Sequence, residues 1–249
     1  MDVNGSDPRD ASLYAVPHRP PIINSAQELR SAQKLGLSLR GAIARNIDLS
    51  WALLDQLRVP GGDFQGANLR GVSLGAADLR LADLSLVRLE QANLAGADLW
   101  GADCSGAQAQ AVNLQTARLI QSRWLQANLR SARFDGADCT KIDLSGADCL
   151  RARFEKTCLQ RALLRGTFLG ACSLQGADLR GANLAGANLS GANLTGAVIT
   201  DADFSEVQLE PKTRQYLLSI ASGIHPLSGR STHETLQPNR KSFLFFWRR

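Results

Sequence analysis

The sequence contains few of the groups from which enzymes and metalloproteins build their sites. Its 249 residues include only three histidines, His18, His225 and His233, and all three lie outside the regular central part of the chain. A Ser-His arrangement or a zinc cluster needs histidine close to nucleophiles or other ligands, so neither is expected. We therefore predict a protein that is not an enzyme and that holds no metal or cofactor.

Cysteine usage and hydropathy argue against two further classes of protein. The five cysteines have no spacing typical of a disulfide framework or a zinc site. No apolar run approaches the length of a membrane span, and the first residues, MDVNGSDPRDASLY, lack the basic and apolar parts of a signal peptide. A cytoplasmic location is the resulting expectation.

An excess of acidic residues is also missing from the central part of the chain. Residues 37–210 contain 17 Lys or Arg and 18 Asp or Glu. The formal net charge of +5 comes from residues 211–249, which contain seven basic residues and one acidic residue. A nearly neutral centre makes direct nucleic-acid binding a less favourable hypothesis.

What the chain does contain is a five-residue repeat that runs from Leu37 to Glu210 without losing phase. Its 35 centres, taken every five residues from Leu39 to Leu209, include 23 Leu, and none is charged. The residue two before each centre is Ala in 22 repeats. A helix would spread this pair over every face, and a plain strand would place successive centres on opposite sides. Each pentapeptide is therefore predicted to turn, as one short side of a coil, with the Ala and the centre facing inward.

Segments such as Ala67-Asn68-Leu69-Arg70-Gly71 and Ala182-Asn183-Leu184-Ala185-Gly186 resemble the pentapeptide-repeat family. The resemblance implies an all-β solenoid, a right-handed quadrilateral β-helix with four repeats per coil and about nine coils. Glycines recur two residues after the centres, where the corners need permissive backbone. The expected organisation is an extended N-terminal arm and capping helix over residues 1–36, the β-helix over 37–210, and a capping helix with a basic, aromatic tail over 211–249.

A coil of 20 residues predicts which centres stack on one another. The large Trp124 would lie next to the small Cys104, and Phe134 would stack on Phe154. Such a compensation of volumes is what a close-packed interior requires.

Short helices are predicted to cover both ends of the tube, because uncovered ends would expose backbone edges. Ser25 and Glu28 form a capping box before a helix over residues 26–35. At the other end, Pro211 begins a helix that Gly223 should stop.

Sorting the outward residues by the 20-residue coil collects apolar and positive side chains on one side. These partner-binding candidates are Leu81, Trp100, Arg118, Ile120, Lys141, Arg161 and Arg180. An exposed Trp flanked by Arg is typical of a binding hot spot, and a solvated face with scattered apolar residues is an equal alternative. A second side is small and nearly uncharged, and it could pack against another subunit or have no binding role; it contains Gly75, Ala76, Ala95, Gly96 and Gln115.

The C-terminal residues form an aromatic cluster followed by two arginines. The candidates for docking or dimerisation are Phe243, Phe245, Phe246 and Trp247. They could dock on the solenoid, join two subunits or touch an anionic membrane surface, and the first two are favoured because the segment is too short to anchor alone. Among the cysteines, four occupy inward positions, and Cys158 is the one candidate for modification.

The sequence therefore predicts a non-catalytic scaffold that binds a protein partner through the side that carries Trp100. The alternative, implied by the resemblance, is a DNA-mimic regulator or protector of a type II topoisomerase, DNA gyrase. The resemblance also implies a homodimer formed near the C-terminal end. The balanced charge of the repeats is what separates the two hypotheses, because a DNA mimic needs a negative surface.

Overall fold

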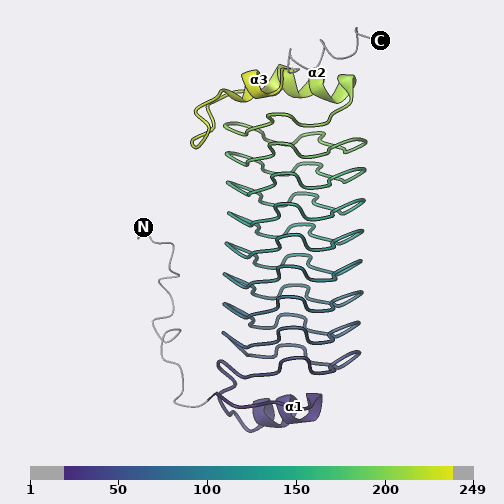
Figure 1. Cartoon of the computed structure of the whole chain (residues 1–249), viewed down its shortest axis with the longest axis vertical. Coiled ribbons are helices and arrows are strands. Elements are labelled where there is room, and N and C mark those ends of the chain that lie inside the picture. Colours follow the sequence, from purple (N-terminus) through teal and green to yellow (C-terminus); the bar gives the residue numbers. More distant parts are fainter. Residues whose placement is uncertain (1–19, 238–249) are drawn as a thin grey trace, which may run out of the picture.

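Parallel β-bridges link residues 20 positions apart along the repeat region, from Ile43 and Asp63 to Asn188 and Gln208. The structure is a computed structural model and describes residues 20–237. Four pentapeptides therefore complete one coil, as expected, and Figure 1 shows the coils stacked into a tall tube. From the first repeat centre to the last, the chain makes about eight and a half coils of 20 residues.

The four repeats of a coil form four faces of the tube, which we number by their repeat centres. The centres recur every 20 residues, from Leu39 to Ile199 on face 1, from Ala44 to Phe204 on face 2, from Leu49 to Leu209 on face 3 and from Leu54 to Leu194 on face 4. Most centres and the residues two before them are buried, whereas the residues on either side of a centre are mostly half-buried or exposed. The inward pair of each repeat thus forms the core, as the sequence predicts.

Each corner of a coil is made by the residue two past a centre, and every such residue from Gly41 to Glu206 has a positive φ. Glycine suits this left-handed conformation, but 19 of the corners hold other residues, for which it costs about 1–2 kcal/mol each. The corner amides also bond to the next coil, as Leu81 N does to the Trp100 carbonyl at 2.8 Å. These bonds hold the corners in place.

The two stacking predictions for the core are confirmed. The Phe134 and Phe154 rings lie 4.6 Å apart and are nearly parallel, at 12°. Trp124 is fully buried, and a bridge between the residues that precede the two centres places Cys104 in the adjoining coil. The indole N–H of Trp124 donates to the Ser122 hydroxyl at 3.1 Å, which satisfies the one polar atom of the side chain.

Helix α1, Ala26–Lys34, closes the first coil (Figure 1). The Ser25 hydroxyl accepts the Glu28 amide at 3.2 Å, which confirms half of the capping box, but the Glu28 carboxylate accepts from Asn24 instead of Ser25. Leu29 is the buried anchor of the helix, and Arg30 Nε donates to the Leu53 carbonyl at 3.0 Å. The helix is thereby tied to the edge of face 4.

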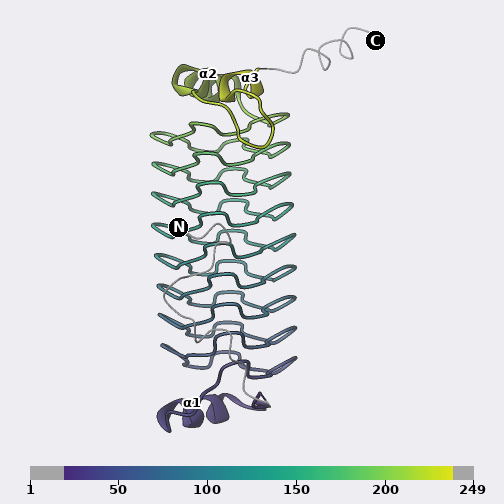
Figure 2. The same ribbon diagram turned by 90° about the vertical axis from the view of Figure 1, so that its left-hand side faces the viewer.

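Two helices cover the opposite end, α2, Pro211–Ile220, and α3, Thr232–Thr235 (Figures 1 and 2). Helix α2 begins at the predicted proline but ends three residues before Gly223. Helix α3 was not predicted, because a single turn carries no periodic pattern. Its Thr235 hydroxyl accepts a hydrogen bond from the Phe204 amide at 3.0 Å. Phe204 lies in the last coil, so its amide has no further coil to bond to.

Candidate functional site

The predicted hot-spot residue Trp100 is buried, with only 7% of its surface exposed, so the expectation of an exposed indole is wrong. The 20-residue register places Arg80 and Ile120 in the same column of face 1, one coil on either side. Coils lie only about 4.8 Å apart, so long side chains of the adjoining coils can reach a large side chain that lies between them. The Trp100 amide also donates to Asp98 at 3.0 Å.

The arginines on face 1 do not form a free positive ladder, because aspartates of the same face neutralise them. Arg80 lies 2.7 Å from Asp78, and Arg118 lies 3.0 Å from Asp98, which in turn lies 3.9 Å from Arg80. Charges paired in this way contribute little to the long-range field of the protein.

The remaining candidates fall into two groups. Arg180 pairs with Asp178 at 2.6 Å, and this hydrogen bond is the main cause of the lowered pKa of Asp178. Leu81, Lys141 and Arg161 share the corner between faces 1 and 2, where all three are exposed, with Leu81 three coils from Lys141. Partner binding by any of the seven candidates stays a prediction.

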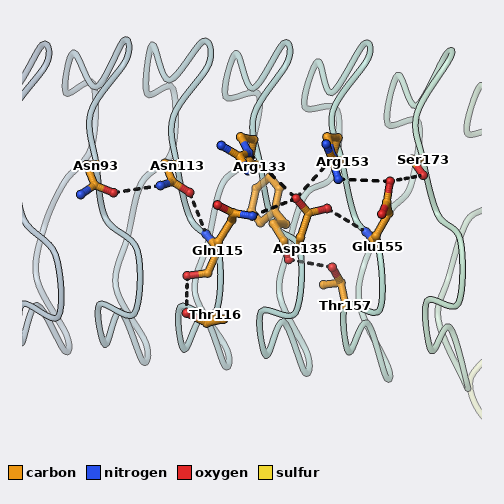
Figure 3. Close-up of polar contacts among 11 residues, drawn as sticks. Asn93, Asn113, Gln115, Thr116, Arg133, Asp135, Arg153, Glu155, Thr157 and Ser173 are labelled. Carbon is orange, nitrogen blue, oxygen red and sulfur yellow. Dashed lines mark hydrogen bonds and ion pairs between the residues drawn. The ribbon is translucent and has the colours of Figure 1, made fainter.

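Face 4 carries a ladder of polar side chains that runs along the axis of the tube (Figure 3). The Asn113 amide donates to Asn93 at 3.0 Å, and the Asn113 oxygen accepts the Gln115 backbone amide at 3.2 Å. Gln115 then donates to Asp135 at 3.2 Å in the next coil. Two of these bonds join side chains of adjoining coils and one joins a side chain to a backbone amide of the same repeat, so these polar groups are satisfied within the face.

The ladder continues through charged residues that neutralise one another (Figure 3). Arg153 bridges Asp135 and Glu155, at 3.3 Å from each carboxylate. Arg133 approaches Asp135 at 4.0 Å, and the Ser173 hydroxyl donates to Glu155 at 3.1 Å. Two arginines and two carboxylates therefore leave this part of face 4, the half nearer to α2, without a net charge.

The half of face 4 nearer to α1 carries small, nearly uncharged side chains, as the sequence predicts. Its only carboxylate is that of Asp55, whose Oδ1 accepts the Ser73 hydroxyl and the Gly75 amide, both at 2.7 Å. The next positions along this half and its corner with face 1 are Ala76, Ala95 and Gly96. These three small residues add no long side chain to the surface.

Two large apolar residues at the base of face 4 were missed by the sequence reasoning. Leu53 lies on the face with 70% of its surface exposed, and Trp51 stands at its corner with face 3 with 61% exposed. A Cβ added to Gly71 would lie 2.2 Å from Trp51 Cε3, so the indole lies across the glycine of the next coil. A large corner residue followed 20 positions later by glycine is the signal that could have found this site.

The cysteines behave as the sequence predicts. Cys104, Cys139, Cys149 and Cys172 are buried, and Cys158 is half-buried. Burial raises the pKa of the first three thiols well above the ordinary value and that of Cys172 to about 12. These four thiols are therefore poor nucleophiles in the folded protein.

Within residues 20–237, no group of three or more His, Cys, Asp or Glu side chains is placed to hold a metal ion. In the same part of the chain, no helix combines the length and the apolar character that a membrane span needs. The N-terminal arm up to residue 19 and the docking candidates Phe243, Phe245, Phe246 and Trp247 lie outside the described residues.

The fold and its satisfied polar faces define a class of protein, the quadrilateral β-helix built from short repeats. A family model described as pentapeptide repeats matches the chain in eight copies, over residues 36–71, 47–85, 88–123, 113–148, 126–166 and 172–210. The chain belongs to the pentapeptide-repeat family. No curated protein matches it.

Several solved structures of pentapeptide-repeat proteins are similar to the chain. HetL of the cyanobacterium Nostoc sp. strain PCC 7120, described as involved in heterocyst differentiation regulation, is 28% identical over 72% of this chain and 96% of its own, with a TM-score of 0.34. A trypsin-treated form of QnrB1, a plasmid-mediated fluoroquinolone resistance protein, is 14% identical over 72% and 95%, with a TM-score of 0.57. A protein of the Arabidopsis thaliana thylakoid lumen is 32% identical over 53% and 88%, with a TM-score of 0.31. The likeness to QnrB1 supports the fold alone.

Proposed function

We propose that this chain is a non-catalytic scaffold that binds a protein partner through face 4. The observation that carries the proposal is the exposure of Trp51 and Leu53 at the base of a face whose next two coils are uncharged and small. The cores of protein interfaces are rich in aromatic residues and poor in charge, and Trp is the most typical hot-spot residue. Face 4 combines these properties.

The polar groups of face 4 support the same proposal, because burying them under a partner would cost little. Asn113 and Gln115 already have partners within the face, and the Asp55 carboxylate is held by a hydroxyl and an amide. A polar group that keeps its hydrogen bonds pays a much smaller desolvation cost than an unpaired one.

The face is also long enough for a specific interface. Six coil spacings separate Leu53 from Ser173, or about 29 Å at the usual distance between neighbouring strands. A standard interface covers about 800 Å² on each partner, which a face of this length can supply together with its corners.

Two charged substitutions on the half of the face nearer to α1 test the proposal without disturbing the coil. Ala76→Lys and Ala95→Arg place long side chains at positions where other repeats already carry them, as Lys156 and Arg130 do. We expect affinity capture from the native host to recover a partner with the unmodified chain and to lose it with this double variant.

A matched control carries the same two kinds of substitution elsewhere, Gln121→Lys on the corner between faces 1 and 2 and Ala185→Arg on face 2. The control should keep the partner. Retention by the face 4 variant together with loss by the control would contradict the proposal and would place binding on the side of Leu81, Lys141 and Arg161.

The alternative function is regulation or protection of DNA gyrase. The tall, narrow tube and the fold shared with QnrB1 favour it. The pairing of aspartates with arginines on faces 1 and 4 ranks it second, because imitation of DNA depends on a negative field. Supercoiling by purified gyrase, with and without a quinolone, that is unchanged by an excess of the protein would remove this alternative.

A further inference from the structure

An open groove of about 710 Å³ lies on face 2, beside its corner with face 3. Its floor is low because Ser85 and Ser105 follow the repeat centres at this level. Leu86 stands on the corner with 63% of its surface exposed, and its Cδ2 would lie 2.8 Å from a Cβ on Gly106. Leu125 continues the column of the serines and adds a second apolar side chain. The groove is therefore apolar along its corner side.

The opposite side of the groove belongs to a column of face 2 that has a net negative charge. Asp103 lines this side together with Arg123, and Asp83 and Asp143 occupy the same column of face 2, one coil before and one coil after this pair. Each of the three aspartates uses Oδ1 to accept the backbone amide two residues further on, at 2.9 Å for Asp83 and Asp103 and 3.0 Å for Asp143. Their Oδ2 atoms are left for other partners; among residues 20–237, the ion pair formed with these atoms is that of Arg123, 3.7 Å from Asp103 Oδ2. With three carboxylates and one guanidinium, the column from Asp83 to Asp143 has a formal charge of −2, which favours a basic ligand.

We propose that this groove binds the chain's own C-terminal segment, residues 238–249, with the aromatic residues 243–247 against Leu86 and Leu125. The segment contains four basic residues and no acidic one, so its charge complements that of the groove. Residues 1–19 contain three acidic and two basic residues and fit this negatively charged column less well.

The structure brings the start of this segment to the correct side of the tube. The described chain ends at Gln237, directly after α3, and α3 binds the last coil at Phe204, a centre of face 2. Arg230 reinforces this placement, since its Nη1 donates to the Ser205 hydroxyl at 2.8 Å on the same face.

The length of the segment matches the distance to the groove. Ser145 marks the near end, three coils from Ser205, or about 14 Å away. Residues 238–243 span up to about 20 Å when extended. Residues 243–247 span about 16 Å, enough to cover the further three coils to Ser85. Docking within one molecule is therefore geometrically allowed.

A photocrosslinking experiment on the full chain tests the proposal. With p-benzoylphenylalanine in place of Phe245, irradiation should join this residue to the segment 85–126 in a product of monomer mass. Leu86→Gln combined with Leu125→Ser removes both leucines and introduces residues that other coils already carry in the same columns. This variant should lower the yield about tenfold, the change that loss of about 1.4 kcal/mol of apolar contact produces. Leu81→Gln, the same substitution on the corner between faces 1 and 2, should leave it unchanged.

The charge of the groove is tested in the same assay. Asp103→Asn with Asp143→Asn should lower the yield, and so should about 1 M salt, which screens exposed charges within about 3 Å. Crosslinks to face 4 or to the caps, or no crosslink at all, would overturn the proposal. A product of dimer mass would assign the groove to a second copy, and crosslinks in the groove from a probe at Tyr14 would assign it to the N-terminal segment; either result also overturns it.

Discussion

Replacing Gly71 by alanine tests the packing that places Trp51 on the outside of the tube. Gly71 has a φ of +62°, and a Cβ there would lie 2.2 Å from Cε3 and 2.3 Å from Cζ3 of the indole. Either the indole or the coil must move. Gly96 is a matched control, because it is also a corner glycine, with a φ of +67°, but the nearest atom to its Cβ would be Thr116 Oγ1 at 3.9 Å.

The magnitudes separate the two substitutions. Alanine in the left-handed region costs about 1–2 kcal/mol, and the lower entropy of the unfolded chain offsets about 0.4–1 kcal/mol of it. Gly96→Ala should therefore lower the free energy of unfolding by about 1 kcal/mol. Gly71→Ala also overpacks the surface against the indole, which should lower the free energy of unfolding by a further amount of about 1–3 kcal/mol.

Urea unfolding followed by circular dichroism measures both variants, and a double-mutant cycle with Trp51→Ala isolates the contact. With the indole removed, the cost of Gly71→Ala should fall to that of Gly96→Ala. Equal losses for the two single variants, or a cost at Gly71 that persists without the indole, would refute the reasoning.

Three further predictions concern the core and the C-terminal cap. Ser122→Ala should lower the free energy of unfolding by about 1–3 kcal/mol, because the buried indole N–H of Trp124 loses its acceptor; urea unfolding that matches the parent would contradict this. Ellman's reagent should titrate at most one thiol in the native protein, that of Cys158, and five after denaturation; rapid reaction of two or more native thiols would mean that the core is open. Burial by itself raises the pKa of Asp203, but hydrogen bonds from Ser205 and Ser228 outweigh it and hold the pKa below the ordinary value of an aspartate. This contribution to stability is complete above the unfolded-state pKa and is lost as the pH falls through the lower folded-state pKa, so thermal unfolding of Asp203→Asn should depend less on pH in the acid range.

The interior of the fold could be predicted from the sequence because inward and outward positions differ in chemical type at every repeat. The period of five requires a turn in each repeat, and the 20-residue coil correctly places Trp124 beside Cys104 and Phe134 on Phe154. These relations depend on register alone. They need no knowledge of how a side chain lies on the surface.

The exposed surface could not be predicted in the same way, because register gives the column of a side chain but not its direction. Trp100 belongs to the expected column, yet it is buried. Trp51 occupies a corner with a φ of +58°, and its indole lies outward over the glycine of the next coil. The pairing of Arg118 with Asp98 likewise depends on side-chain reach between coils. Exposure is thus decided by packing between coils.

Photocrosslinking in the native host tests the claim that face 4 is the partner surface most directly. With p-benzoylphenylalanine in place of Ala76, we expect a covalent adduct with a host protein, whereas the same probe in place of Gln121 should give none. An adduct from Gln121 and none from Ala76 would contradict the account.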